Sequence, residues 1–169
     1  MLTDTVVVDD QGGYFCHRPS LVPLKHQIWV RFSVLTCSVF VRRSTVEEFG
    51  LYFDTKWRDL GDVFWLMELV NRGVRMGVLR QFTSVFTETG ENMNLKPNAA
   101  RERAEKDKMM HPWVKRLSPL LVLHHKLRML LSGAYSQKPF AYSLYTLASP
   151  TQRILHHVSR PTARWRGRF

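Results

Sequence analysis

The sequence predicts a mixed α/β fold, and three observations support this prediction. Short β-prone runs alternate with helix-prone runs along residues 1–95. Hydrophobic residues make up 44% of the 169 residues and aromatic residues 12%, which is typical of a globular chain rather than a disordered one. From residue 96 on, the chain becomes basic and mainly helix-prone. We therefore divide it into residues 1–95 and a C-terminal extension, residues 96–169.

The chain begins with a predicted β-hairpin. Two β-prone runs, residues 5–8 and 14–17, flank the sequence Asp9-Asp-Gln-Gly-Gly13. Adjacent carboxylates followed by Gln-Gly-Gly are typical of a turn, so we assign Asp9 and Asp10 to the hairpin rather than to a metal site. A further β-prone run, residues 35–41, comes before Arg42 and Arg43.

Two helices and two strands follow in the first part. Ser44 and Glu47 form a capping box, which predicts a short helix that ends at Gly50. A longer helix is predicted from Asp62 to Gly73, because its apolar residues fall on one stripe. Residues 74–79 and 82–86 are predicted as separate strands.

The C-terminal extension is predicted to be helical and to end in a strand pair. Pro97 starts a charged helix over residues 99–110, and His111-Pro112 ends it. Residues 113–131 are expected to form one apolar helix that Gly133 closes. Residues 140–147 and 153–158 predict the strand pair, and a basic tail, residues 160–169, comes last.

The positive charge lies almost entirely in the second part of the chain. Residues 1–94 hold 10 Lys and Arg against 11 Asp and Glu, whereas residues 95–169 hold 15 against 3. Such a block predicts a phosphate-bearing partner: an anionic lipid surface, a nucleotide or a nucleic acid. Nucleic acid is the less favoured partner, because the first part is nearly neutral.

The apolar helix in this basic block has two interpretations. Residues 117–131 are rich in leucine, and Lys115, Arg116, Lys126 and Arg128 lie beside or among them, as in helices that lie in a membrane interface. The alternative is a helix packed on the sheet with its charges in solvent. Cys16 and Cys37 are too few for a disulfide framework, and the first residues lack a signal-peptide pattern. We therefore expect a cytoplasmic protein, peripheral at the inner membrane face.

The most informative segment surrounds Asp62. A carboxylate in the first turn of a helix is held ionised by the helix dipole and the free N–H groups, and it can accept a proton from a hydroxyl. Trp65, one turn further on, offers a flat ring beside it. The alternative is that Asp62 caps its helix and Trp65 packs in the core.

Three segments in this order resemble the second half of a family-2 glycosyltransferase with the GT-A fold. They are Cys37-Ser-Val-Phe-Val-Arg-Arg43, Gly50-Leu-Tyr-Phe-Asp54 with Leu60-Gly-Asp-Val-Phe-Trp65, and Val85-Phe-Thr87 with Thr89-Gly-Glu-Asn92. The resemblance covers about residues 4–95. It implies a partial GT-A fold with residues 96–169 as an extension.

The resemblance also implies an activity and a set of site residues. The reaction would transfer a sugar, with inversion, from a nucleotide-sugar donor to a hydroxyl acceptor. Asp62 would be the general base, Trp65 the platform for the acceptor, and Arg42, Arg43 and Gly61 further substrate contacts.

In this family an Asp-x-Asp motif binds Mg²⁺ or Mn²⁺ against the leaving diphosphate. The sequence contains no Asp-x-Asp motif. We therefore expect the N-terminal, nucleotide-binding half to be missing, through a truncated gene, a split gene or a mis-assigned start. Alone, the chain should be inactive and should not bind a sugar nucleotide. The competing class is a basic module that binds anionic membrane or nucleic acid without catalysis.

Overall fold

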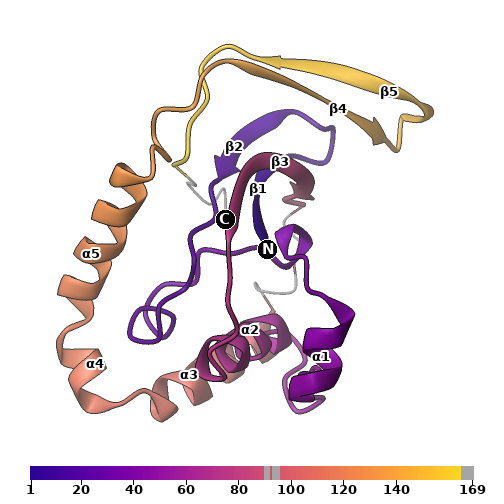
Figure 1. The fold of residues 1–169 in the computed structure, drawn as a ribbon. Coiled ribbons are helices and arrows are strands. Elements are labelled where there is room, and N and C mark those ends of the chain that lie inside the picture. Colours follow the sequence, from indigo (N-terminus) through magenta and orange to yellow (C-terminus); the bar gives the residue numbers. More distant parts are fainter. Residues whose placement is uncertain (90–91, 93–95, 165–169) are drawn as a thin grey trace.

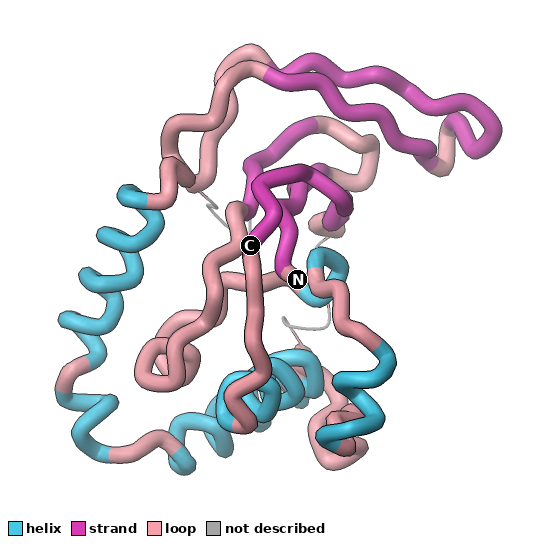
Figure 2. Tube along the Cα trace, viewed as in Figure 1, coloured by secondary structure: helices cyan, strands magenta, loops and turns pink. Residues whose placement is uncertain are grey.

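The structure is a computed structural model that describes residues 1–89, 92 and 96–164. These residues form a mixed α/β fold with five α-helices, one short 3-10 helix and two small sheets. The strands gather toward one end of the molecule, while the helices lie at the other end and along one flank (Figure 2). The structure therefore confirms that the fold class is mixed α/β, as predicted.

The first sheet has its most buried strand in the centre. Strand β1 (Leu2–Val8) lies between β2 (Tyr14–Arg18), which is antiparallel to it, and β3 (Val78–Thr87), which is parallel (Figure 1). All seven residues of β1 are buried. The predicted hairpin is confirmed, and Asp9 shapes its turn by accepting hydrogen bonds from the N–H groups of Gln11 and Gly13 at 3.1 and 2.7 Å.

The prediction of a strand over residues 35–41 was wrong. The segment contains the 3-10 helix Thr36–Ser38, and only Val39 forms an isolated bridge, with Leu2. Hydroxyl groups favour this local structure, because Ser38 Oγ donates to Leu35 O at 2.7 Å and Thr3 Oγ1 donates to Ser38 O at 3.2 Å.

The prediction of two strands over residues 74–79 and 82–86 was wrong: residues 74–77 are not in a strand, and one strand, β3, runs from Val78 to Thr87. Its pairing with β1 moves from Thr3–Leu79 directly to Asp4–Phe82. A bulge therefore accommodates Arg80 and Gln81 without ending the strand.

Helices α1 (Arg43–Phe49) and α2 (Gly61–Asn71) lie together at the other end of the molecule (Figure 1). The predicted capping box is wrong: α1 starts at Arg43, and Glu47 pairs with Arg43 Nε at 2.7 Å instead of reaching back to Ser44. The predicted helix ends are confirmed, since Gly50 follows α1 with φ 59° and Gly73 follows α2 with φ 72°.

The main core forms between α2 and the start of β1. The inner face of α2 packs against Leu2 and against the loop that holds Ile28 and Val34. The buried residues of this cluster are Leu2, Ile28, Val34, Leu51, Leu60, Val63, Leu66, Met67, Leu69 and Val70. The core therefore fixes α2 relative to the central strand.

Three helices follow along one flank: α3 (Pro97–Met109), α4 (Pro112–Arg116) and α5 (Ser118–Leu131). The prediction of one helix over residues 113–131 was wrong, because the chain breaks at Leu117 between α4 and α5. Pro119 accounts for the break, since it has no N–H to donate to the carbonyl four residues earlier.

The second sheet is a hairpin, β4 (Phe140–Thr146) and β5 (Ser149–Val158), which confirms the predicted strand pair. It lies over the β1–β2 end of the first sheet (Figure 1). Phe140 stacks on Phe82 with ring centroids 4.6 Å apart, and Tyr142 OH donates to Gly12 O at 2.7 Å. Two predicted segments fall partly outside the described residues: the tail 160–169 beyond Arg164, and Gly90 and Glu91 of the loop after β3.

Candidate functional site

The structure locates Asp62 in the first turn of α2, facing the 3-10 helix. Its Oδ2 accepts a hydrogen bond from Thr36 Oγ1 at 2.5 Å, and its Oδ1 accepts one from Val63 N at 2.8 Å. The residue is half-buried, so part of the carboxylate still meets solvent. Asp62 lies inside the helix rather than at the N-cap, which is Leu60. The hydrogen bond from Thr36 connects the 3-10 helix to α2 and fixes the orientation of the Asp62 carboxylate.

Aromatic side chains lie beside this helix start. The Trp65 ring is fixed twice: its Nε1 donates to Leu51 O at 2.9 Å, and it stacks on Phe53 with centroids 5.0 Å apart and planes inclined by 14°. Phe53 and Tyr52 expose 54% and 70% of their surface. A Cβ at Gly61 would lie 3.7 Å from the Phe53 ring, so Gly61 and Phe53 are neighbours. The aromatic surface therefore borders the turn that carries Asp62.

A buried carboxylate holds the backbone that leads into α2. Glu102, from α3, is only 2% exposed. It accepts hydrogen bonds from the N–H groups of Arg58, Asp59 and Leu60 at 2.8, 3.1 and 2.8 Å. Burial alone would raise the pKa of Glu102, but these bonds and one from Asn98 outweigh it and hold the pKa below its ordinary value. Glu102 thus satisfies three N–H groups of the backbone that leads into α2.

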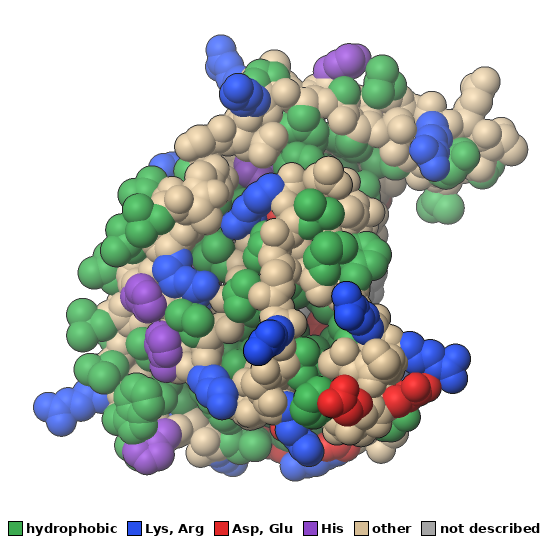
Figure 3. Space-filling view, in the orientation of Figure 1, with side chains coloured by type: hydrophobic (Ala, Val, Ile, Leu, Met, Phe, Trp, Pro, Cys, Tyr) green, Lys and Arg blue, Asp and Glu red, His purple; other side chains and the backbone are tan. Residues whose placement is uncertain are grey.

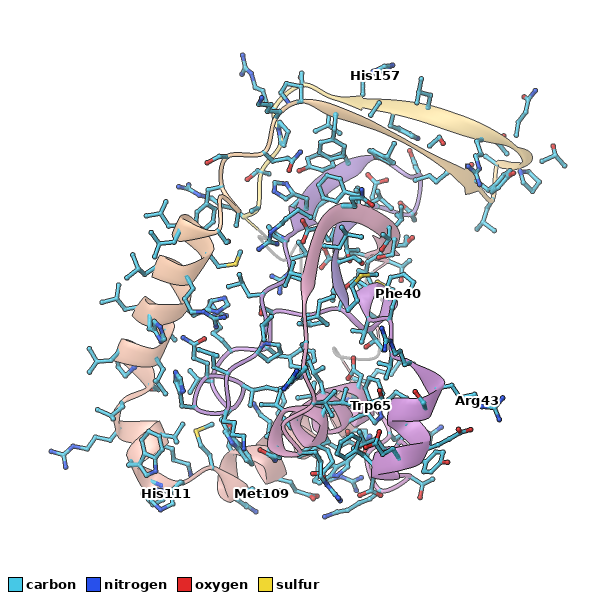
Figure 4. All side chains as sticks on the ribbon, in the orientation of Figure 1. Phe40, Arg43, Trp65, Met109, His111 and His157 are labelled. Atoms are coloured by element: carbon cyan, nitrogen blue, oxygen red, sulfur yellow. The ribbon has the colours of Figure 1, made fainter. Side chains whose placement is uncertain are left out.

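The two arginines named from the sequence lie elsewhere. Arg43 pairs with Glu47 on α1, and its side chain is 91% exposed. It projects away from the body of the molecule, whereas Trp65 lies on the α2 side (Figure 4). Arg42 lines a groove of about 910 Å³ together with Phe40 and Phe49, and Asp62 is not among the residues that line it. The structure therefore brings together Asp62, Gly61 and Trp65, but neither arginine.

Sequence reasoning missed three residues of this neighbourhood. Phe53 stood in the quoted motif without a role, and its exposure was not predictable from the pattern. Thr36 lay in a segment predicted as a strand. Glu102 lies in a helix rich in charges, and no local signal distinguishes it from Glu105.

Other titratable groups offer little further chemistry. Burial raises the pKa of the Cys16 thiol to about 12, which makes it a poor nucleophile. In the residues that the structure describes, no group of three or more His, Cys, Asp or Glu side chains is arranged to hold a metal ion. Within the described part of the chain, the side chains therefore do not fit the divalent-metal site that the resemblance implies.

Comparison with known proteins adds no assignment: no protein-family model, no curated protein and no solved structure matches the chain.

Proposed function

We propose that this chain carries the acceptor side of a glycosyltransferase that moves a sugar from a nucleotide-sugar donor to an acceptor hydroxyl, with inversion. One observation carries the proposal: the half-exposed Asp62, oriented by Thr36, directly follows Gly61, which neighbours the Phe53 ring that stacks on Trp65. Sugar-binding sites need this pairing, because apolar rings receive the flat face of a sugar while a few polar groups fix its hydroxyls.

The chemistry follows from these side chains. An acceptor hydroxyl would approach Asp62, transfer its proton to the carboxylate and attack the anomeric carbon of the donor, while the bond from that carbon to the diphosphate oxygen breaks and the nucleoside diphosphate leaves with the electron pair. Thr36 would keep the carboxylate in position, since its hydroxyl donates to Oδ2. The proposal assigns the donor and its Mg²⁺ or Mn²⁺ to a second part of the enzyme, fused or separate, because the described residues do not form a metal site.

The general-base assignment is tested by Asp62→Asn in the enzyme completed with a donor-binding half. Asn keeps the shape of the side chain but cannot take the proton. Release of the nucleoside diphosphate should slow by about 10²–10⁴-fold in kcat, with little change in the acceptor KM. Asp54→Asn is the matched control, because the Asp54 carboxylate lies in an exposed loop, where it accepts a bond from Lys56 N. Near-normal turnover of Asp62→Asn would contradict the assignment.

The acceptor surface can be tested on the chain alone. Saturation-transfer NMR with simple glycosides should show contact with the protein, and Phe53→Ala should abolish it. Phe40→Ala is the control, since Phe40 is an exposed aromatic residue in the groove that Arg42 lines. Equal loss from both variants, or the absence of any sugar contact, would contradict an acceptor site at Phe53 and Trp65.

A further inference from the structure

Helix α5 exposes a continuous row of leucines. Leu120, Leu123 and Leu127 expose 62%, 62% and 51% of their surface. Leu130 and Leu131 continue the row, and their spacing of three and four residues puts all five on one side of the helix. We call these five residues the leucine face. Hydrophobic atoms follow this flank of the molecule in Figure 3.

Trp113 and Leu117 add to this apolar surface at the start of α5. Trp113, in α4, exposes 47% of its surface, and Leu117, between α4 and α5, exposes 39%. The apolar flank therefore extends beyond one helix. Several exposed large apolar side chains on neighbouring segments are typical of an interaction site.

The opposite side of α5 is held to the body of the protein. Arg128 donates to Gln27 Oε1 at 2.7 Å and to Val22 O at 2.8 Å. Met129 is buried in a small cluster with Leu21 and Ala134. Because these contacts fix how the helix is rotated, the leucine face cannot turn inward. The sequence left two interpretations open: a helix packed on the body of the protein, or a helix that lies in a membrane interface. In the structure, one side of α5 packs on the body and the leucine face is exposed.

Charge identifies the kind of partner that fits this face. Asp107 is the last acidic side chain in the sequence, so neither α4 nor α5 contains any carboxylate side chain. Lys115 and Arg116 are exposed just before the leucine face, and Lys126 is exposed along its border. Apolar side chains flanked by cations, with no acidic neighbour in the helix, match the acyl and headgroup layers of an anionic bilayer.

The length of the helix sets its orientation. The 14 residues of α5 extend about 21 Å, short of the roughly 30 Å of a bilayer core. Among the described residues, no helix meets the length and hydropathy needed to cross a membrane. A helix of this size with one apolar face lies along the surface.

We propose that α5 docks this protein on the surface of an anionic lipid bilayer, with the leucine face inserted among the acyl chains and Lys115, Arg116 and Lys126 at the headgroups. This inference rests on α4 and α5 alone and is independent of the proposed acceptor site.

The test is co-sedimentation of the full chain with vesicles of phosphatidylcholine, with and without phosphatidylglycerol. Binding should require the anionic lipid and weaken as salt rises. Leu123→Ser/Leu127→Ser should lower the partition coefficient at least tenfold, and Lys126→Gln about fivefold, as the removal of one headgroup contact predicts. Leu155→Ser and Arg75→Gln are the controls, because these exposed residues lie outside α4 and α5; both should bind like the wild type.

Three outcomes would overturn the proposal. One is that the chain binds equally to vesicles with and without phosphatidylglycerol, or binds to neither. Another is wild-type binding by Leu123→Ser/Leu127→Ser, with circular dichroism showing that the variant is folded. The third is a dimer, detected by light scattering without lipid, that this double variant dissociates; the leucine face would then bind a second copy of the chain.

Discussion

At the scale of single residues, Glu102 links α3 to the start of α2. Its carboxylate accepts from three successive backbone N–H groups, those of Arg58, Asp59 and Leu60, and from the Asn98 side chain. These N–H groups lie just before α2, so the bonds fix the direction in which the helix begins. The position of Asp62, one residue into that helix, therefore depends on a side chain from a distant element.

Glu102→Gln should destabilise the fold by about 2–4 kcal/mol, because one carboxylate oxygen becomes an NH₂ group that faces buried N–H donors. Thermal unfolding should show a midpoint lower by roughly 2–4 °C for each kcal/mol. Glu105→Gln is the matched control: its pair with Lys56 spans 3.9 Å between exposed side chains, and its loss should cost less than about 1 kcal/mol. Equal midpoints for both variants would contradict this role of Glu102.

His125 makes stability depend on pH. Burial, with the nearby charges of Arg31, Arg128, Arg18 and His124, lowers the pKa of His125 to about 4, from an ordinary value of 6.5. Between these two values the unfolded chain binds a proton that the folded chain does not. The free energy of unfolding should therefore fall as pH drops from 6.5 toward 4, by up to about 1.4 kcal/mol per pH unit.

Urea unfolding at pH 7.5, 6.5 and 5.5 measures this dependence. Burial also lowers the pKa of His17, which acts in the same direction, so a variant is needed to separate the two residues. His125→Gln should reduce the slope of the profile below pH 6.5, and the dependence that His17 causes should remain. An unaltered slope in His125→Gln would show that other groups cause the dependence.

At the scale of elements, Gly12 joins the two hairpins. It has φ 84°, and an added Cβ would lie 3.0 Å from Leu144 Cδ1 and 3.2 Å from Thr146 Cγ2 of β4. Gly12→Ala should therefore cost about 1–3 kcal/mol through backbone strain and lost packing between the hairpins. Chemical denaturation measures the change. Gly77→Ala is the control, since none of the described atoms would lie within 4 Å of a Cβ added at Gly77. A loss of stability in Gly77→Ala as large as in Gly12→Ala would contradict this role of Gly12.

The elements that the sequence predicted well are those whose signals are local. The first hairpin follows from Asp9 and its glycines, and the helix ends follow from Gly50 and Gly73, whose φ values favour glycine. The predictions that were wrong failed because tertiary contacts or a second local signal decided the structure. Residues 35–41 are β-prone, but Thr3 and Ser38 hydroxyls favour a 3-10 turn there. Pro119 indicates the break before α5, but the apolar pattern over residues 113–131 favoured one continuous helix.

The candidate site could be predicted only in part, for the same reason. Asp62, Gly61 and Trp65 are close in sequence, so one helix start necessarily brings them together. Thr36 and Glu102 reach the site through tertiary packing, which no spacing in the sequence reveals. Arg42 and Arg43 were named because a strand was expected to lead to them, and without that strand they lie on and before α1.

At the scale of the whole molecule, burial is distributed unevenly. The main core joins α2 to β1, and its buried members all lie within residues 2–70. On the flank, α5 is held by Arg128 and by the cluster of Leu21, Met129 and Ala134. Its leucine face meets solvent, so less apolar surface stabilises α5 than stabilises β1.

We therefore expect amide hydrogen exchange to separate these regions. Amides of β1 should exchange only on global unfolding, while those of α5 should open at a free energy lower by at least about 1–2 kcal/mol. Arg128→Ala removes two hydrogen bonds from a charged donor and should speed exchange in α5 by tenfold or more, without affecting β1. Lys126→Ala, on the exposed side of the same helix, should change neither region. Equal protection of α5 and β1, or faster exchange in β1 of Arg128→Ala, would show that the flank and the core unfold as one unit.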